Sequence, residues 1–208
     1  PYNFIDPDLW HEMTLIRESL RAGHLIRSNP FAYTPSVSPV VHHEWGAGTL
    51  AFFAIRWLGG TGVVLLKYLA AFLTAFFCFR CAARRGVGGQ LFCLLALMAA
   101  FLAHLGFYTS VRAQVYTFAF TACLLWLLER DRSGDRKWMV VWLAVFPLWV
   151  NLHAGFVVGI GLLGLHWIEE MTRRKFRPDL ILVIGGMLAE TLLNPYGTSF
   201  HAYLSRAL

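Results

Sequence analysis

The stretch VVLLKYLAAFLTAFFCF, residues 63–79, decides the fold class of this chain. Its side chains are apolar almost throughout, with Lys67 as the charged residue inside it, and Arg80, Arg84 and Arg85 follow at once. A long apolar segment that ends in arginines is typical of a helix that crosses a bilayer with its basic end in the cytoplasm. We therefore predict a transmembrane helix here, with Lys67 snorkelling towards the nearer interface.

The composition of the whole chain is also that of a membrane protein. Of 208 residues, 57% are hydrophobic and 14% are charged, whereas soluble domains have roughly 45–50% apolar and about 25% charged residues. The net charge of +6 could indicate a nucleic-acid partner. Most of the 18 Lys and Arg residues, however, lie in three short loops, which is the pattern that marks cytoplasmic loops. We therefore expect no nucleic-acid partner.

The three basic loops alternate with loops that are poor in Lys and Arg. The basic residues are Arg80, Arg84, Arg85, Arg130, Arg132, Arg136, Lys137, Arg173, Arg174, Lys175 and Arg177, and the later apolar runs are 91–103, 115–128, 138–150, 156–168 and 180–193. This alternation predicts an all-α fold, namely a polytopic transmembrane helical bundle. We expect residues 1–208 to form one domain, with an external juxtamembrane region at 1–58 and about six transmembrane segments in 59–208. Because the chain opens on a polar run without an initiator Met, we expect further residues before Pro1.

Two carboxylates, Asp6 and Asp8, flank Pro7 before a predicted amphipathic helix at 8–22, which we expect to lie on the membrane surface. They either cap this helix or take part in catalysis. In the second case one of them is a general base whose pKa its neighbour shifts, and Asp8 could bind a divalent cation such as Mg²⁺ or Mn²⁺.

A second polar group, His43 and Glu44, precedes an apolar helix predicted at 44–58. Glu44 either caps that helix or takes part in acid–base chemistry, and His43 is a candidate to bind substrate. This helix is short and interrupted, so we expect it not to cross the membrane. That choice places residues 1–58 on the external face.

The loops that are poor in Lys and Arg supply the remaining candidates. Arg112 suits a phosphate through its planar fork, or it snorkels to external headgroups. Asn151 and His153 lie between two short apolar runs, where they either contact substrate or hydrogen-bond neighbouring helices. Asn194 and Tyr196 belong to NPYG, which is either a turn or part of the substrate site. We expect Asp6 or Asp8, Glu44, Arg112, His153 and Asn194 to line one cavity that opens to the outer face.

Six motifs together resemble a known family. They are DPDLWH at 6–11, NPFAYT at 29–34, HEW at 43–45, RAQ at 112–114, WVNLHAGF at 149–156 and LNPYG at 193–197. The pattern is similar to a group of bacterial polytopic membrane proteins in the GT-C glycosyltransferase superfamily, the class related to protein mannosyltransferases and lipid A aminoarabinose transferases. The chain departs from that pattern at His11, where the family often has a second Trp, and at Asn29, where it often has Asp.

The resemblance implies an enzyme of the bacterial cytoplasmic (inner) membrane whose site faces the periplasm or cell exterior. It would move a sugar from a polyprenyl-phosphate-linked donor to an acceptor, with Asp6 or Asp8 as base and with Arg112 and a divalent cation at the departing phosphate. Two other classes remain open from the residues alone. One is a transporter or flippase for a lipid-linked or anionic solute, and the other is a non-catalytic membrane assembly subunit.

Overall fold

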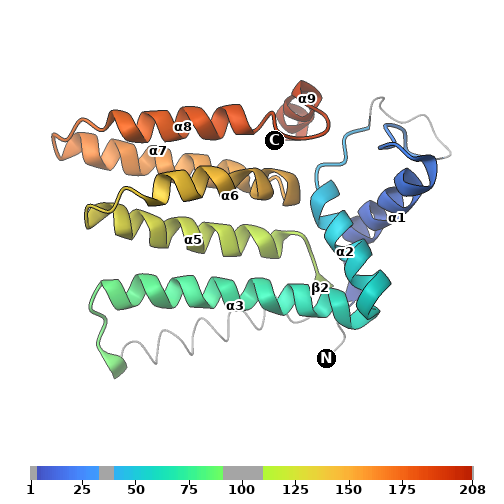
Figure 1. The fold of residues 1–208 in the computed structure, drawn as a ribbon, viewed down its shortest axis with the longest axis horizontal. Helices are drawn as coiled ribbons and strands as arrows, with labels where there is room; N and C mark the ends of the chain where they lie inside the picture. The colour runs from blue at the N-terminus through green and yellow to red at the C-terminus, as the bar shows by residue number, and fades with distance from the viewer. Residues whose placement is uncertain (1–3, 33–39, 91–109, 208) are drawn as a thin grey trace.

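The computed structural model describes residues 4–32, 40–90 and 110–207 (Figure 1). These residues are helical apart from turns, loops and two short strands. In chain order the elements are β1 (Phe4–Ile5), α1 (Pro7–Ala22), α2 (Trp45–Leu58), α3 (Gly60–Arg84), β2 (Ser110–Val111), α5 (Gln114–Arg132), α6 (Trp138–Leu152), α7 (Phe156–Thr172), α8 (Pro178–Glu190) and α9 (Thr198–Ala207).

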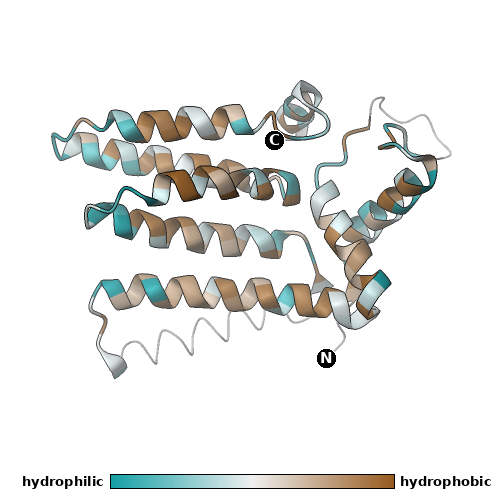
Figure 2. Cartoon of the chain, viewed as in Figure 1, coloured by the Kyte–Doolittle hydropathy of each residue, from teal (hydrophilic) through white to brown (hydrophobic). Residues whose placement is uncertain are grey.

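The long helices lie side by side, and the N-terminal helices lie across one end of them. In Figure 1, α3, α5, α6, α7 and α8 run alongside one another, while α1 and α2 lie at one end, near α9. The polar loops that carry the basic residues lie at the other end (Figure 2). The strands β1 and β2 pair in parallel with Phe4 opposite Ser110 and Ile5 opposite Val111, which joins the start of the chain to the start of α5.

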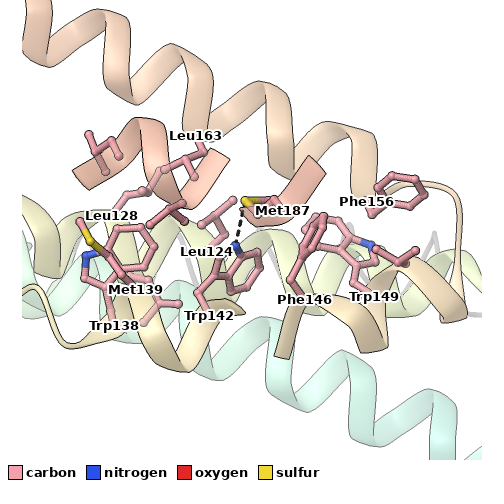
Figure 3. Packing of buried hydrophobic residues seen from close by; sticks show 14 of the residues in the cluster. Leu124, Leu128, Trp138, Met139, Trp142, Phe146, Trp149, Phe156, Leu163 and Met187 are labelled. Carbon is pink, nitrogen blue, oxygen red and sulfur yellow. Dashed lines mark hydrogen bonds between the residues drawn. The ribbon is translucent and has the colours of Figure 1, made fainter. Parts of the chain in front are cut away.

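The main core is built on one face of α6. Trp138, Trp142 and Phe146 recur every four residues, so that their side chains stack along the same side of the helix and are almost completely buried (Figure 3). Trp142 donates a hydrogen bond from Nε1 to Sδ of Met187 on α8 at 3.4 Å. Trp149, one turn further along α6, stacks on Phe120 of α5, with ring centroids 5.4 Å apart. The apolar run that was predicted to face lipid therefore faces protein along this side.

The prediction of a polytopic transmembrane helical bundle is wrong, although the helical class itself is as expected. Within the described ranges, only α3, with 25 residues, is both long and apolar enough to cross a membrane. The apolar helix α6 has 15 residues and therefore rises only about 22 Å, which is short of a hydrocarbon core of about 30 Å. The predicted segment at 91–103 lies outside the described residues.

The helix α3 is nevertheless unusual for a helix of a compact domain. Only 22% of its most apolar window is buried inside the protein, and Phe72 and Leu69 are among its exposed side chains (Figure 2). Lys67 is fully buried, so the prediction that it snorkels is wrong. The described residues thus include one candidate membrane-spanning helix, and multi-pass placement is not supported.

Candidate functional site

Asp6 begins α1 and is bonded to Arg112. Its Oδ1 accepts a hydrogen bond from the backbone N–H of Asp8 at 3.1 Å, as an N-cap residue does, and Pro7 follows in the first position of the helix. Its Oδ2 accepts from Nε of Arg112 at 2.6 Å, and its backbone N–H donates to the carbonyl of Val111 at 3.1 Å. Both carboxylate oxygens of Asp6 therefore form bonds that stabilise the fold. This agrees with the alternative that Asp6 caps the helix.

Glu44 lies between two imidazoles at the start of α2. Its Oε1 is 3.4 Å from Nε2 of His153, which ends α6, and 3.8 Å from Nε2 of His43. Glu44 occupies the N-cap position of α2, but its side chain makes no capping hydrogen bond. The carboxylate is therefore directed at the two rings instead of at the helix that it precedes.

The contacts of the His153 ring assign its hydrogen to Nε2. Nδ1 accepts a hydrogen bond from the backbone N–H of Gly155 at 2.9 Å, and it also lies 2.9 Å from Oγ1 of Thr117. Thr117 in turn accepts from Nε1 of Trp149 at 3.1 Å, which turns its own hydrogen towards the ring. A neutral imidazole that accepts at Nδ1 carries its hydrogen on Nε2. Nε2 lies 3.4 Å from Oε1 of Glu44 without forming a hydrogen bond to it.

Burial tunes these groups towards proton transfer. It raises the pKa of Glu44 to about 7, and the negative charge of Asp8 adds to the effect. Burial lowers the pKa of His153 to about 4, helped by His43, and it also lowers the pKa of His43. At neutral pH both rings are therefore uncharged, whereas Glu44 is present in both its protonated and its ionised form. A carboxyl group whose pKa lies near the working pH is suited to general acid–base catalysis.

Asp8 and Arg112 place opposite charges on the surface, within electrostatic range of Glu44. The side chain of Asp8 is exposed and makes no hydrogen bond or ion pair to any residue that the structure describes. The side chain of Arg112 is 54% exposed, and its bond to Asp6 uses only Nε. The charges of both residues act on the pKa of Glu44, in opposite directions. The charge of an exposed guanidinium thus reaches a proton acceptor.

Glu12 and His42 form a buried pair that the sequence pattern does not single out, because an acid in the first turns of a helix is ordinary. Glu12 is 5% exposed, and its Oε2 lies 3.8 Å from Nδ1 of His42 with no hydrogen-bond partner among the described residues. Nε2 of His42 lies 3.2 Å from the carbonyl of Ile26 and so donates to it. Burial raises the pKa of Glu12 to about 8, and the charge of Glu44 contributes.

Asn151 joins three parts of the fold. Its Oδ1 accepts from Nε1 of Trp45 at 2.8 Å, and its Nδ2 donates to the carbonyls of Pro147 and Leu193 at 2.7 and 2.8 Å. The first turn of α2 lies so close that a Cβ on Gly46 would be 2.4 Å from the backbone oxygen of Asn151. Both ends of the side-chain amide are thus engaged in interhelical bonds, the structural alternative for this residue.

Asn194 and Tyr196 form the turn between α8 and α9. Oδ1 of Asn194 accepts from the backbone N–H of Tyr196 at 2.8 Å, and its Nδ2 donates to the carbonyl of Thr191 at 2.8 Å. Tyr196 is buried with its ring edge-on to His42. Of the two alternatives for Asn194 and Tyr196, the turn is the one that these contacts support. The structure groups Asp6, Asp8, His43, Glu44, Arg112 and His153 together, while Asn194 makes its contacts within the turn.

The described residues do not by themselves form the predicted divalent-cation site. Over residues 4–32, 40–90 and 110–207, no group of three or more His, Cys, Asp or Glu side chains is placed to hold a metal ion. Asp8 supplies one carboxylate, whereas Mg²⁺ sites use several oxygen ligands.

At the opposite end of the helices, Asp131 is the centre of a buried ionic cluster that the sequence did not reveal. It is 2% exposed. Its oxygens accept from Nε2 of His166 at 2.9 Å, from both Nη groups of Arg177 at 3.0 and 3.1 Å, from Nε1 of Trp138 at 3.0 Å, and from Arg136. Burial acts to raise the pKa of Asp131, but these hydrogen bonds outweigh it and hold that pKa far below its usual range. Two basic loops thus also fasten α5 to α6, α7 and α8.

Comparison with known proteins does not identify a family for this chain. The chain matches no family model, no curated protein and no solved structure. The resemblance to the GT-C superfamily therefore stays a prediction.

Proposed function

We propose that this chain is a membrane-attached glycosyltransferase that moves a sugar from a polyprenyl-phosphate carrier to an acceptor hydroxyl. The observation that carries the proposal is the position of Glu44. Its carboxylate lies between the Nε2 atoms of His153 and His43, and it is close enough to the half-exposed Arg112 to feel its charge. A proton acceptor and an exposed guanidinium within electrostatic range of it are the two groups that sugar transfer from a lipid phosphate requires.

The reaction would use these groups as follows. The acceptor hydroxyl gives its proton to Glu44 while its oxygen attacks the anomeric carbon of the donor sugar. The bond between that carbon and the phosphate oxygen breaks, and its electron pair leaves with the lipid phosphate. The Nη groups of Arg112 bind the phosphate as its negative charge grows. The uncharged ring of His153, with Nε2 3.4 Å from Oε1 of Glu44, lies beside the base and would line the acceptor side of the site.

The placement of α3 supports an orientation for the site. Arg80, Arg84 and Arg85 lie at the end of α3, so the positive-inside pattern favours the cytoplasm for that end. The site lies at the other end of the helices, beside α1 and α2 (Figure 1). We infer attachment to the bacterial inner membrane through α3, with Glu44 and Arg112 on the external side.

The experiment is transfer of labelled sugar from a polyprenyl-phosphate donor by the full chain in lipid nanodiscs. Glu44→Gln should lower the rate by about 10²–10⁴-fold while the donor still binds, since a base acts mainly in the transition state. Arg112→Lys keeps the charge but loses the fork, so it should weaken donor binding as well. Glu18→Gln, on the exposed side of α1, is the matched control. Near-normal transfer by Glu44→Gln would contradict the proposal, and movement of a lipid-linked solute without transfer would favour a transporter.

A further inference from the structure

A groove between α1 and α2 has apolar walls and two arginines. Its volume is about 420 Å³. The first helix contributes Trp10, Met13 and Arg17, and the second contributes Phe52, Ile55 and Arg56. Residues three and four positions apart lie on one face of a helix, so these two stripes face each other across the groove. None of them belongs to the site around Glu44.

The charge on the groove is positive. Arg56 is exposed and forms no hydrogen bond or ion pair within the described part of the chain. Arg17 donates from Nε to Glu18 at 2.9 Å, but Glu18 is shared with Arg21, which donates from Nη1 at 2.9 Å. The two arginines thus face a single shared carboxylate. The ligand that complements an apolar slot with such an excess of guanidinium groups is a phosphate joined to a hydrocarbon chain.

The groove also lies where a bilayer surface would be. Its second wall, α2, ends at Leu58, and α3 begins at Gly60 directly after Gly59, whose φ of 62° allows the sharp change of direction. Trp57 and Leu58 at this junction are 74% and 58% exposed. Exposed tryptophan at the end of a membrane helix is typical of the headgroup region. The groove is thus next to the end of the helix that would enter the membrane.

We propose that the α1–α2 groove binds an anionic phospholipid of the surrounding bilayer. Its phosphate would contact Arg17 and Arg56, and its acyl chain would lie against Trp10, Met13 and Phe52. The lipid would hold α1 and α2 at the membrane surface and so steady the helices that carry Asp8 and Glu44. This assignment does not depend on sugar transfer.

The test uses the full chain in phosphatidylcholine nanodiscs that contain a minor fraction of either brominated phosphatidylglycerol or brominated phosphatidylcholine. Bromine on the acyl chain quenches nearby tryptophan, and the difference between the parent protein and Trp10→Phe isolates the share of Trp10. An arginine near a membrane surface favours an anionic lipid by about fivefold. We therefore expect Trp10 to be quenched at several-fold lower mole fractions of phosphatidylglycerol than of phosphatidylcholine.

Three variants make the test specific. Arg17→Gln with Arg56→Gln should abolish the preference, whereas Arg17→Lys with Arg56→Lys keeps both charges and should retain most of it. Arg27→Gln, at an exposed arginine that lies outside the groove and does not contact Glu18, should leave it unchanged. If the Gln pair does not fold, Arg56→Gln alone replaces it and should lose about fivefold. Equal quenching by both lipids in the parent protein, or an unchanged preference without the two arginines, would overturn the assignment.

Discussion

Nε2 of His153 lies 3.4 Å from Oε1 of Glu44, and these two residues lie at the ends of different helices. One ends α6 and the other begins α2, so the geometry of the site depends on how closely the two helix ends meet. Gly46 makes that approach close, because a Cβ there would strike the backbone of Asn151. The site is therefore sensitive to changes in packing that touch none of its charged groups.

The pH dependence of sugar transfer should follow the ionisation of Glu44. The base must be deprotonated, so we expect the rate to rise with pH around a midpoint near 7. Asp8→Asn removes a negative charge that raises the pKa of Glu44, so the midpoint should move to lower pH. The measurement is the pH–rate profile of wild type, Asp8→Asn and Glu18→Gln. A midpoint that stays in place, or moves upward, in Asp8→Asn would contradict this account.

The stability of the fold should depend on pH through Glu12. The folded state holds the proton of Glu12 up to about pH 8, whereas the unfolded chain releases it near its ordinary value of 4.5. Between these values the folded state binds more protons, so the free energy of unfolding falls as pH rises. Glu12→Gln removes this loss. The variant should be more stable than wild type at pH 8, by on the order of 3 kcal/mol.

Chemical unfolding of wild type and Glu12→Gln at pH 5 and pH 8 measures this difference. Glu18→Gln, an exposed acid on the same helix, is the control and should not reproduce the pH-dependent gain. The account fails if the two proteins differ equally at both pH values.

Gly155→Ala should displace the ring of His153 and destabilise the fold around it. A Cβ at this position would lie 2.3 Å from Oγ1 of Thr117 and 2.8 Å from Nδ1 of His153, so the ring could not keep its place. We expect a cost of about 1–3 kcal/mol in the free energy of unfolding. Gly161→Ala on α7 meets no heavy atom within 4 Å and should be neutral or stabilising by up to about 1 kcal/mol. Thermal unfolding compares them, and equal melting temperatures for the two variants would refute the packing argument.

Asp131→Asn should destabilise the far end of the helices. The neutral amide leaves the buried side chain of Arg177 with weaker compensation, and removing one partner of a buried ion pair typically costs about 3–5 kcal/mol. Asp135→Asn breaks the more exposed pair with Arg130 and should cost less than about 1 kcal/mol. Urea unfolding of both variants decides the point, and similar losses would show that burial of Asp131 does not set the cost.

The sequence predicted helices well where local signals act. The expected helix at 8–22 matches Pro7–Ala22, because the Asp-Pro start is a local capping pattern, and the expected 44–58 matches Trp45–Leu58. The apolar pattern did not predict the final turn of α5. The helix expected at 115–128 continues to Arg132, since Arg132 and Glu129 form an ion pair that an apolar pattern does not register.

The error about the bundle has a physical cause. An apolar run reports that side chains avoid water, and it does not distinguish a lipid environment from a protein core. Trp138, Trp142 and Phe146 are apolar because they fill the core between α6 and its neighbours. For the site, residue types pointed to Glu44, His153 and Arg112. The pairings of Glu12 with His42 and of Asp131 with Arg177 depend on helix packing, which no local pattern reveals.

The pairing of β1 with β2 has a consequence for the order in which the protein assembles. Asp6 accepts a hydrogen bond from Arg112, which lies 106 residues later in the chain. Trp45 donates one to Asn151, and these two residues are also 106 positions apart. During synthesis from the N-terminus, the first two helices are made long before these partners leave the ribosome. Contacts of such long sequence separation slow folding, because a large loop must close before they form. The charged groups around Glu44 can come together only after the polypeptide has been extended beyond His153.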